Sequence, residues 1–304
     1  MDSQGKLATL REQINEIDAK LVPLFLERMA VAKQIGTVKG QNNLAVQDPT
    51  REQQVLDRAL SFSDQTLQGE TTLLMRTIMA LAREYQVRQW MHREAPLLAP
   101  AAAPATGSIV CAYAGGVNIS MWCKKALEKL YPEAGKLELP SSEDVFLAVR
   151  QKQAQYGIVH LENSVTGAVG ETYDLLRKYG CFISGRTSID AIPAEATPAS
   201  EKDRPTYNVF VLISSQPEYN EASDLISISF STAHRPGALC EALIPFMAMG
   251  INILRIDSWP AGADKYRFFA DLSGNILDQN MISALRQTAS GCEYFEVLGC
   301  YSNR

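Results

Sequence analysis

An arginine interrupts the most regular apolar pattern in this chain, and this limits what the N-terminal third can fold into. The apolar residues recur at alternating steps of three and four, with Arg28 in their midst: Leu7, Leu10, Ile14, Ile17, Leu21, Leu24, Val31, Ile35 and Val38. Such spacing is typical of a helix that buries a narrow seam against other helices. A guanidinium stays charged there and is costly to bury alone. The pattern therefore predicts a partner for Arg28, either a carboxylate of the protein or an anionic ligand, and we favour the ligand.

The region from residue 6 to residue 92 is expected to be entirely helical. A first helix over residues 6–39 would be about 50 Å long, too long to be buried within one small domain. Its partner helices come most economically from a second copy of the chain. Asp48 and Pro49 form an N-cap followed by proline, which predicts a second helix through Ser63. A third helix is expected over residues 69–92.

After the helical region the sequence changes to alternating strand and helix patterns, so we expect a multidomain protein. Residues 1–94 form the helical domain, and the proline- and alanine-rich stretch 95–107 is an interdomain linker. Residues 108–220 alternate strand and helix patterns, as in an α/β domain, with an unstructured connection expected between Ser188 and Thr206. The order βαββαβ in residues 221–304 predicts a ferredoxin-like fold.

Composition argues against several functional classes. The net charge is −5 with no basic run, so nucleic acid is not the expected partner. No apolar stretch reaches about 18 residues, and the N-terminus lacks the apolar core of a signal peptide, so a membrane span or secretion is not expected. Six cysteines without CxxC spacing, only three histidines and no phosphate-binding glycine motif predict a cytoplasmic protein without metal or cofactor.

Four cations of the helical region form a candidate site. Arg28 and Lys39 are eleven residues apart, which places them within about 20° of the same helix face and about 16 Å from each other, so both can reach one small ligand. Arg51 follows at the start of the second helix. Arg11 lies about 25 Å before Arg28 on another face of the helix. If Arg11 takes part, it must come from another protomer.

The residues of this region resemble a known family. LREQINEIDAKLVPLFLERMAVAKQIGTVK followed by VQDPTREQQVLDR is similar to the all-helical chorismate mutases, specifically those fused to prephenate dehydratases. The resemblance implies an intertwined homodimer that rearranges chorismate to prephenate. Such a reaction needs no nucleophile or metal, only a held conformer and stabilised charge on the departing ether oxygen. The roles it implies are as follows: Arg11 comes from the partner, Arg28 and Arg51 bind carboxylates, Lys39 and Gln89 face the ether oxygen, Asp48 and Glu52 bind the hydroxyl and order the site, and Tyr85 replaces a serine that contacts a carboxylate.

The middle segment resembles the prephenate dehydratase domain in VCAYAGG, GIVHLENSVTGAVGETYDLL and YNVFVLISS. The segment differs from the family at the motifs that carry the catalytic residues. Residues 117–120 replace a glycine-rich Gly-Thr/Ser-Phe stretch, Asn208-Val209-Phe210 replaces Thr-Arg-Phe, and residues 191–205 stand where the family inserts a second lobe. Loss of dehydratase activity is therefore expected. For Glu162-Asn163-Ser164 two interpretations stay open, a ligand-binding loop and a turn that only caps the following helix.

Residues 224–304 resemble the ACT domain of the same fusion enzymes. Gly237, Ala238 and Leu239 match its first effector loop, and Asp257-Ser258-Trp259-Pro260 matches a Glu-Ser-Arg-Pro motif. Trp259 removes the cation of that motif. The domain is expected either to keep an amino-acid effector or to serve only in dimer contacts.

Three functions remain open on this reading. The favoured one is a chorismate mutase of aromatic amino acid biosynthesis that has lost dehydratase activity. The second is a bifunctional enzyme that also dehydrates or decarboxylates prephenate. The third is a non-catalytic allosteric or scaffolding subunit.

Overall fold

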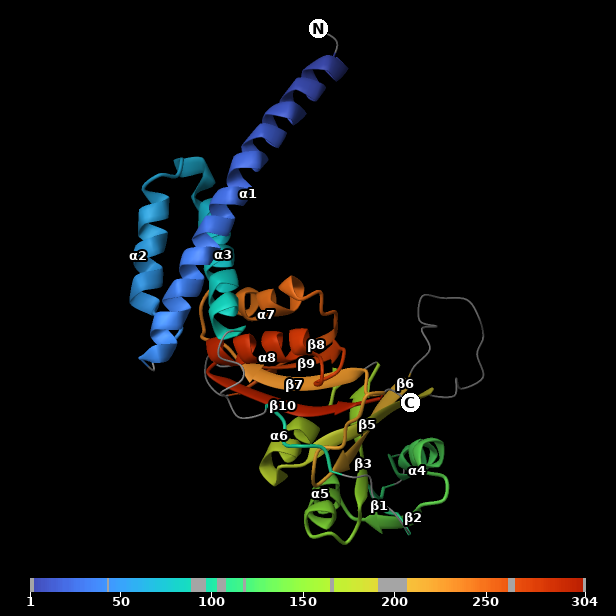
Figure 1. Cartoon of the computed structure of the whole chain (residues 1–304). Coiled ribbons are helices and arrows are strands. Elements are labelled where there is room, and N and C mark those ends of the chain that lie inside the picture. The colour runs from blue at the N-terminus through green and yellow to red at the C-terminus, as the bar shows by residue number, and fades with distance from the viewer. Residues whose placement is uncertain are drawn as a thin grey trace.

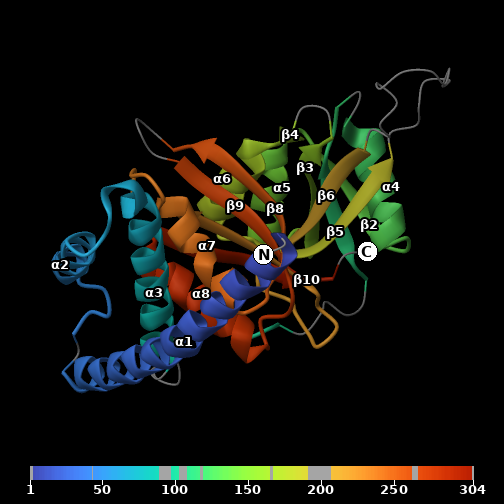
Figure 2. The same cartoon turned by 90° about the horizontal axis from the view of Figure 1, so that it is seen from above.

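The computed structural model describes residues 3–42, 44–88, 97–102, 108–116, 119–164, 167–190, 207–261 and 266–302. The chain forms a helical part, an α/β lobe and a second sheet covered by two helices (Figures 1 and 2). No helix in the described ranges is long and apolar enough to cross a membrane.

The helical part contains α1 (Ser3–Gln41), α2 (Pro49–Leu60), a short 3₁₀ helix (Gln65–Leu67) and α3 (Gln68–Arg88). The predicted start of α2 is confirmed, because Asp48 is the N-cap, its side chain accepts from the Arg51 N–H, and Pro49 is the first helical residue. The helix ends at Leu60, earlier than expected. Pro23 lies inside α1, a helix breaker that the apolar pattern alone did not reveal.

Helix α1 packs on α3 through its C-terminal half, where Ala32 and Gly36 are buried. The N-terminal half projects beyond the other helices (Figure 1). The apolar seam that contains Arg28 is exposed to solvent in the single chain; Ile17 and Leu24, for example, are 60% and 62% exposed. An apolar stripe of this length in water requires a covering surface from elsewhere.

The α/β lobe is a sheet of order β2-β1-β3-β6-β5, with the short β4 paired to β3. Strands β2, β1 and β3 run parallel, and β6 is antiparallel to both β3 and β5. Its elements are β1 (Val110–Ala114), α4 (Ile119–Leu130), β2 (Gly135–Leu139), α5 (Ser142–Arg150), β3 (Tyr156–Asn163), β4 (Gly167–Ala168), α6 (Gly170–Tyr179), β5 (Phe182–Asp190) and β6 (Tyr207–Ser214). Strand β5 extends to Asp190, so the expected unstructured connection after Ser188 begins later than predicted, and residues 191–206 lie outside the described ranges.

The C-terminal part has the expected βαββαβ order: β7 (Leu225–Ser231), α7 (Ala238–Ala248), β8 (Ile253–Pro260), β9 (Tyr266–Ser273), α8 (Gln279–Gly291) and β10 (Tyr294–Tyr301). The antiparallel sheet has the order β10-β7-β9-β8. Helices α7 and α8 cover one face, with Phe246 and Leu285 in the core beneath them. The other face meets the α/β lobe, where β10 approaches β5 so closely that a Cβ on Gly299 would lie 2.1 Å from the Ile183 carbonyl oxygen. Leu98 of the predicted linker is buried in the same core.

Candidate functional site

Two of the predicted cations lie on the half of α1 that contacts α3. Arg28 is partly buried, and burial lowers the pKa of its guanidinium. Lys39, also partly buried, donates from Nζ to the Val46 carbonyl at 2.6 Å, which draws the loop before α2 toward the end of α1. Neither side chain forms an ion pair with the described residues. Both cations are therefore available to an anionic ligand.

The start of α2 brings three more predicted residues close to this end of α1. Asp48 is occupied as the N-cap, and Arg51 is exposed, with Nη1 3.3 Å from the Gln54 amide oxygen. Glu52 is partly buried and pairs with Arg83 of α3 at 2.5 Å. Arg83 was not identified as a candidate from the sequence. Its position one turn before Gln86, on the apolar face of the third predicted helix, could have indicated that it is partly buried and needs a partner.

The glutamine that α3 presents to α1 is Gln86. It is 7% exposed, it contacts Gly36 so closely that a Cβ there would lie 2.9 Å from its Cγ, and its Oε1 accepts no hydrogen bond from the described residues. Gly36 precedes Lys39 by less than one helical turn. Gln89, the glutamine expected from the sequence, lies outside the described residues. Tyr85 faces a different surface, an apolar groove between α1 and α3 lined by Phe25, Leu26 and Met29 among others.

Arg11 lies on the exposed N-terminal half of α1, away from α2 and α3 (Figure 1). Within the described residues of one chain it makes no ion pair. Lys39, Arg51 and Glu52 thus lie near one end of the bundle, and Arg28 lies about 16 Å from Lys39 along α1. Arg11 is about 25 Å farther along the helix and cannot reach them from its own chain. No cluster of three or more metal-binding side chains occurs in the described ranges.

A second charged region joins the helical part to the C-terminal part, where α3 packs against α7 and α8. Glu241 of α7 pairs with Arg76 of α3 at 2.5 Å and with Arg235 at 2.6 Å. Burial acts to raise the pKa of Glu241, but the hydrogen bonds from the two arginines outweigh it and lower that pKa. Next to this network lies the Arg83–Glu52 pair, and the two border a cavity of about 450 Å³.

The expected effector residues do not all share one site in the single chain. Gly237, in the left-handed conformation, precedes α7 and lines a pocket of about 210 Å³ with Ala238, Leu239 and Phe268. Ser258 pairs with Phe268 across the sheet and so lies on the same face. Asp257 points to the opposite face, where it forms an ion pair with Arg255. Ser258 therefore lies on the same face of the sheet as the Gly237 loop, whereas Asp257 lies on the opposite face and cannot contribute to one site with that loop.

The Glu162-Asn163-Ser164 segment does not cap a helix, so that interpretation is wrong. Glu162 and Asn163 belong to β3, and α6 begins after Val169, which offers no side-chain cap. Glu162 instead pairs with Arg255 of β8 at 3.2 Å. Asn163 donates to the Asn208 side chain at 2.8 Å, and Val209 is buried in the lobe core. The positions aligned with Thr-Arg thus hold an amide already hydrogen-bonded and an apolar side chain. Residues 117 and 118 lie outside the described ranges.

Arg255 is the centre of a charged cluster between the two sheets. Besides Glu162 it pairs with Asp257 and lies 3.5 Å from Asp271, and it donates to the Tyr173 hydroxyl at 2.8 Å. Burial acts to lower the pKa of Arg255, but the acidic groups around it raise that pKa above its ordinary value. Asp271 also pairs with Arg186 of β5 at 2.7 Å. The cluster fixes the C-terminal sheet on the α/β lobe.

Trp259 strengthens the same interface. A Cβ on Gly170, at the start of α6, would lie 2.4 Å from the Trp259 indole, so only glycine permits this contact. The tryptophan that stands in place of the family arginine therefore packs against the α/β lobe.

Two family models match the chain. Residues 10–87 match chorismate mutase type II, and residues 116–192 match prephenate dehydratase. The bifunctional chorismate mutase/prephenate dehydratase of Aquifex aeolicus (strain VF5) is 25% identical over 369 residues, covering 97% of this chain and 98% of the relative. That aligned length exceeds the 304 residues of the chain, so the relative contains segments without a counterpart here.

Solved structures share the fold of about two thirds of the chain. Prephenate dehydratase from Streptococcus mutans is 25% identical, with a TM-score of 0.51 over 64% of this chain and 99% of that chain. Prephenate dehydratase from Arthrobacter aurescens, in complex with L-Phe, is 19% identical, with a TM-score of 0.52 over 64% of this chain and 90% of that chain.

Proposed function

Because the chain belongs to the family of bifunctional chorismate mutase/prephenate dehydratases, we propose that it is a chorismate mutase that converts chorismate to prephenate. The observation that carries the proposal is the pair Arg28 and Lys39 on the contact half of α1. Both are partly buried and neither is neutralised by a described carboxylate. A substrate that carries two carboxylates supplies the missing negative charge.

The chemistry needs positioning and charge stabilisation only. Arg28 offers a planar fork suited to a carboxylate, and Lys39 offers a point charge for the ether oxygen on which negative charge grows as the carbon–oxygen bond breaks. Asp48 holds the start of α2, which sets the position of Arg51 and Glu52. No proton transfer or covalent intermediate is required of the chain.

The purified protein incubated with chorismate is expected to consume it faster than the uncatalysed rearrangement, with prephenate as the product. Loss of the chorismate absorbance follows the reaction, and chromatography identifies the product. A rate equal to that of buffer would refute the proposal and favour the non-catalytic subunit.

We further propose that the site is completed by Arg11 of a second copy, because the exposed seam of α1 requires a covering surface and Arg11 cannot reach Arg28 in its own chain. Mixing unfolded Arg11→Ala and Arg28→Ala chains and refolding them together should restore activity that neither variant has. Each mixed dimer regains one intact site, so about a quarter of wild-type activity is expected for random pairing. No gain over the separate variants would rule out a shared site.

We propose Gln86, rather than Gln89, as the glutamine that faces the ether oxygen. It is the buried amide beside the turn of α1 that holds Lys39, and its Nε2 is the group that can donate to that oxygen. Gln86→Ala is expected to lower kcat by about 10²-fold, the usual effect of losing one donor to a developing oxyanion. Gln89→Ala, the matched control, should stay near wild type. The reverse order would restore the assignment made from the sequence.

Dehydratase activity is proposed to be lost, so that the reaction stops at prephenate. Support comes from Asn208 and Val209, which offer neither an acid nor a cation. The relatives are named bifunctional, and for this reason prephenate itself should be supplied as a substrate. Formation of phenylpyruvate would establish the second activity.

The C-terminal part is proposed to be an ACT-type domain in a cytoplasmic homodimer. Its βαββαβ order and the L-Phe complex of a related dehydratase support an amino-acid effector at Gly237, Ala238 and Leu239. The position of Asp257 on the other face of the sheet argues that it serves the Arg255 cluster instead.

A further inference from the structure

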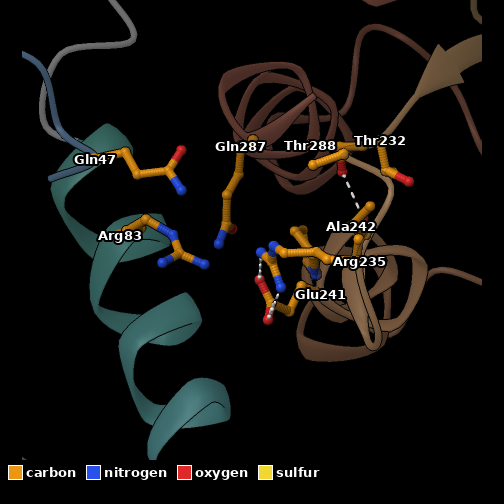
Figure 3. A pocket seen from close by; sticks show the side chains of 12 residues that line it. Gln47, Arg83, Thr232, Arg235, Glu241, Ala242, Gln287 and Thr288 are labelled. Atoms are coloured by element: carbon orange, nitrogen blue, oxygen red, sulfur yellow. Dashed lines mark hydrogen bonds and ion pairs between the residues drawn. The ribbon is translucent and has the colours of Figure 1, made fainter. Parts of the chain in front are cut away.

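A cavity of about 450 Å³ lies between the helical bundle and the C-terminal part, a size within the range of small-molecule sites. Figure 3 shows an adjoining smaller pocket of about 40 Å³, which shares Gln47, Arg83, Arg235 and Glu241 with the cavity and is also lined by Gln287. The cavity shares Arg235 with the Gly237–Leu239 loop pocket and Glu52 with the proposed mutase residues. It coincides with neither of those two sites.

Hydrogen-bond donors exceed acceptors in the wall. Glu241 is occupied by two arginines, Arg76 and Arg235, and Glu52 by Arg83. A guanidinium has five N–H donors, and Arg76 and Arg83 each donate one described hydrogen bond to a carboxylate. Glu293, the remaining acid of the wall, is exposed at its rim. The unused donors match a ligand with acceptor oxygens, and a carboxylate fits a guanidinium best.

A buried acceptor lines the adjoining smaller pocket. Gln287 is 5% exposed, and its Nε2 donates to the Ala80 carbonyl of α3 at 2.7 Å. Its Oε1 is buried and accepts no hydrogen bond from the described residues. Figure 3 shows the amide beside Arg83. A buried amide oxygen without a donor is costly, so a ligand with its own O–H or N–H group would satisfy it.

Leu56 and Met79 add apolar side chains to the wall of the cavity, and Pro245 lines the adjoining pocket. We propose that this cavity binds a small carboxylic acid that has an apolar body and a hydroxyl or amino group beside its carboxylate. The carboxylate pairs with Arg83 and Arg76, and the neighbouring donor reaches Gln287. The proposal does not depend on the proposed mutase activity, because binding is measured without turnover.

Isothermal titration calorimetry with two probes tests the site. L-Phenyllactate and 3-phenylpropanoate differ by the hydroxyl beside the carboxylate. Both should bind with saturation, L-phenyllactate roughly tenfold more tightly, the usual gain from one buried hydrogen bond. Arg83→Gln should weaken both by about tenfold or more, and Gln287→Leu should abolish the preference between the two probes.

Two control variants separate this cavity from its neighbours. Tyr266→Ala alters the loop pocket, and Arg28→Ala alters the proposed mutase site, so both should leave binding of the two probes unchanged. Absence of saturable binding overturns the proposal, as does binding that is insensitive to Arg83→Gln or is lost in either control. Circular dichroism verifies the fold of each variant. If Arg83→Gln unfolds, Gln287→Leu tests the proposal alone: loss of the preference for L-phenyllactate supports it, and an unchanged preference overturns it.

Discussion

Removing either cation from the contact half of α1 is expected to abolish chorismate turnover while the fold is retained. Arg28→Ala and Lys39→Ala should each lower kcat/KM by at least about 10²-fold, because each deletes a charge aimed at an anionic substrate or at the oxygen that becomes negative. Neither side chain forms a described ion pair, so thermal unfolding should change little for Arg28→Ala, whereas Lys39→Ala also loses the hydrogen bond to the Val46 carbonyl and should cost about 1 kcal/mol. Initial rates of chorismate loss, together with circular dichroism melts, provide the two measurements.

Two further variants make this test specific. Arg28→Lys keeps the charge but loses the planar fork, so it should recover only part of the activity. Arg58→Ala removes an exposed cation from α2 of the same domain and should be near wild type. Equal losses in Arg58→Ala and Arg28→Ala would mean that overall charge, and not a site, governs the rate.

Local chemistry made the helical part predictable. Asp48 and Pro49 specify the start of α2 through a cap and a fixed φ, which act within one turn of the chain. The argument that singled out Arg28, a polar residue in an apolar stripe, also applies to Gln86, which continues the buried stripe of Met79 and Ala82. From the sequence the glutamine was assigned to Gln89 by resemblance, and burial in the structure is what favours Gln86.

Contacts between distant segments could not be predicted from the sequence. Arg255 and Glu162 are far apart along the chain and meet only because two sheets pack face to face. In the same way, the contact of Trp259 with Gly170 depends on how the C-terminal sheet packs against the α/β lobe. The resemblance to the ACT domain predicted only that Trp259 stands where the family has an arginine, and it did not indicate what the tryptophan contacts.

Arg255→Leu is expected to destabilise the chain by about 3–5 kcal/mol, since deleting one partner of a buried ion cluster leaves its counter-charges uncompensated. Glu162 and Asp257 would lose their described cation, whereas Asp271 would keep Arg186. Urea unfolding followed by fluorescence measures the loss. Lys178→Ala, which breaks the exposed pair with Glu143, should leave the stability nearly unchanged.

The pH dependence of Arg255→Leu distinguishes uncompensated charge from lost contacts. Without the arginine, burial should favour the protonated form of the carboxyl groups that had surrounded it. A carboxyl with a raised pKa favours folding below the unfolded pKa and loses that contribution as pH rises. The deficit relative to wild type should therefore be smaller near pH 5 than near pH 7, and adding Glu162→Gln and Asp257→Asn should recover part of the stability. A deficit independent of pH and of these substitutions would assign the effect to lost packing of the arginine side chain against Tyr173.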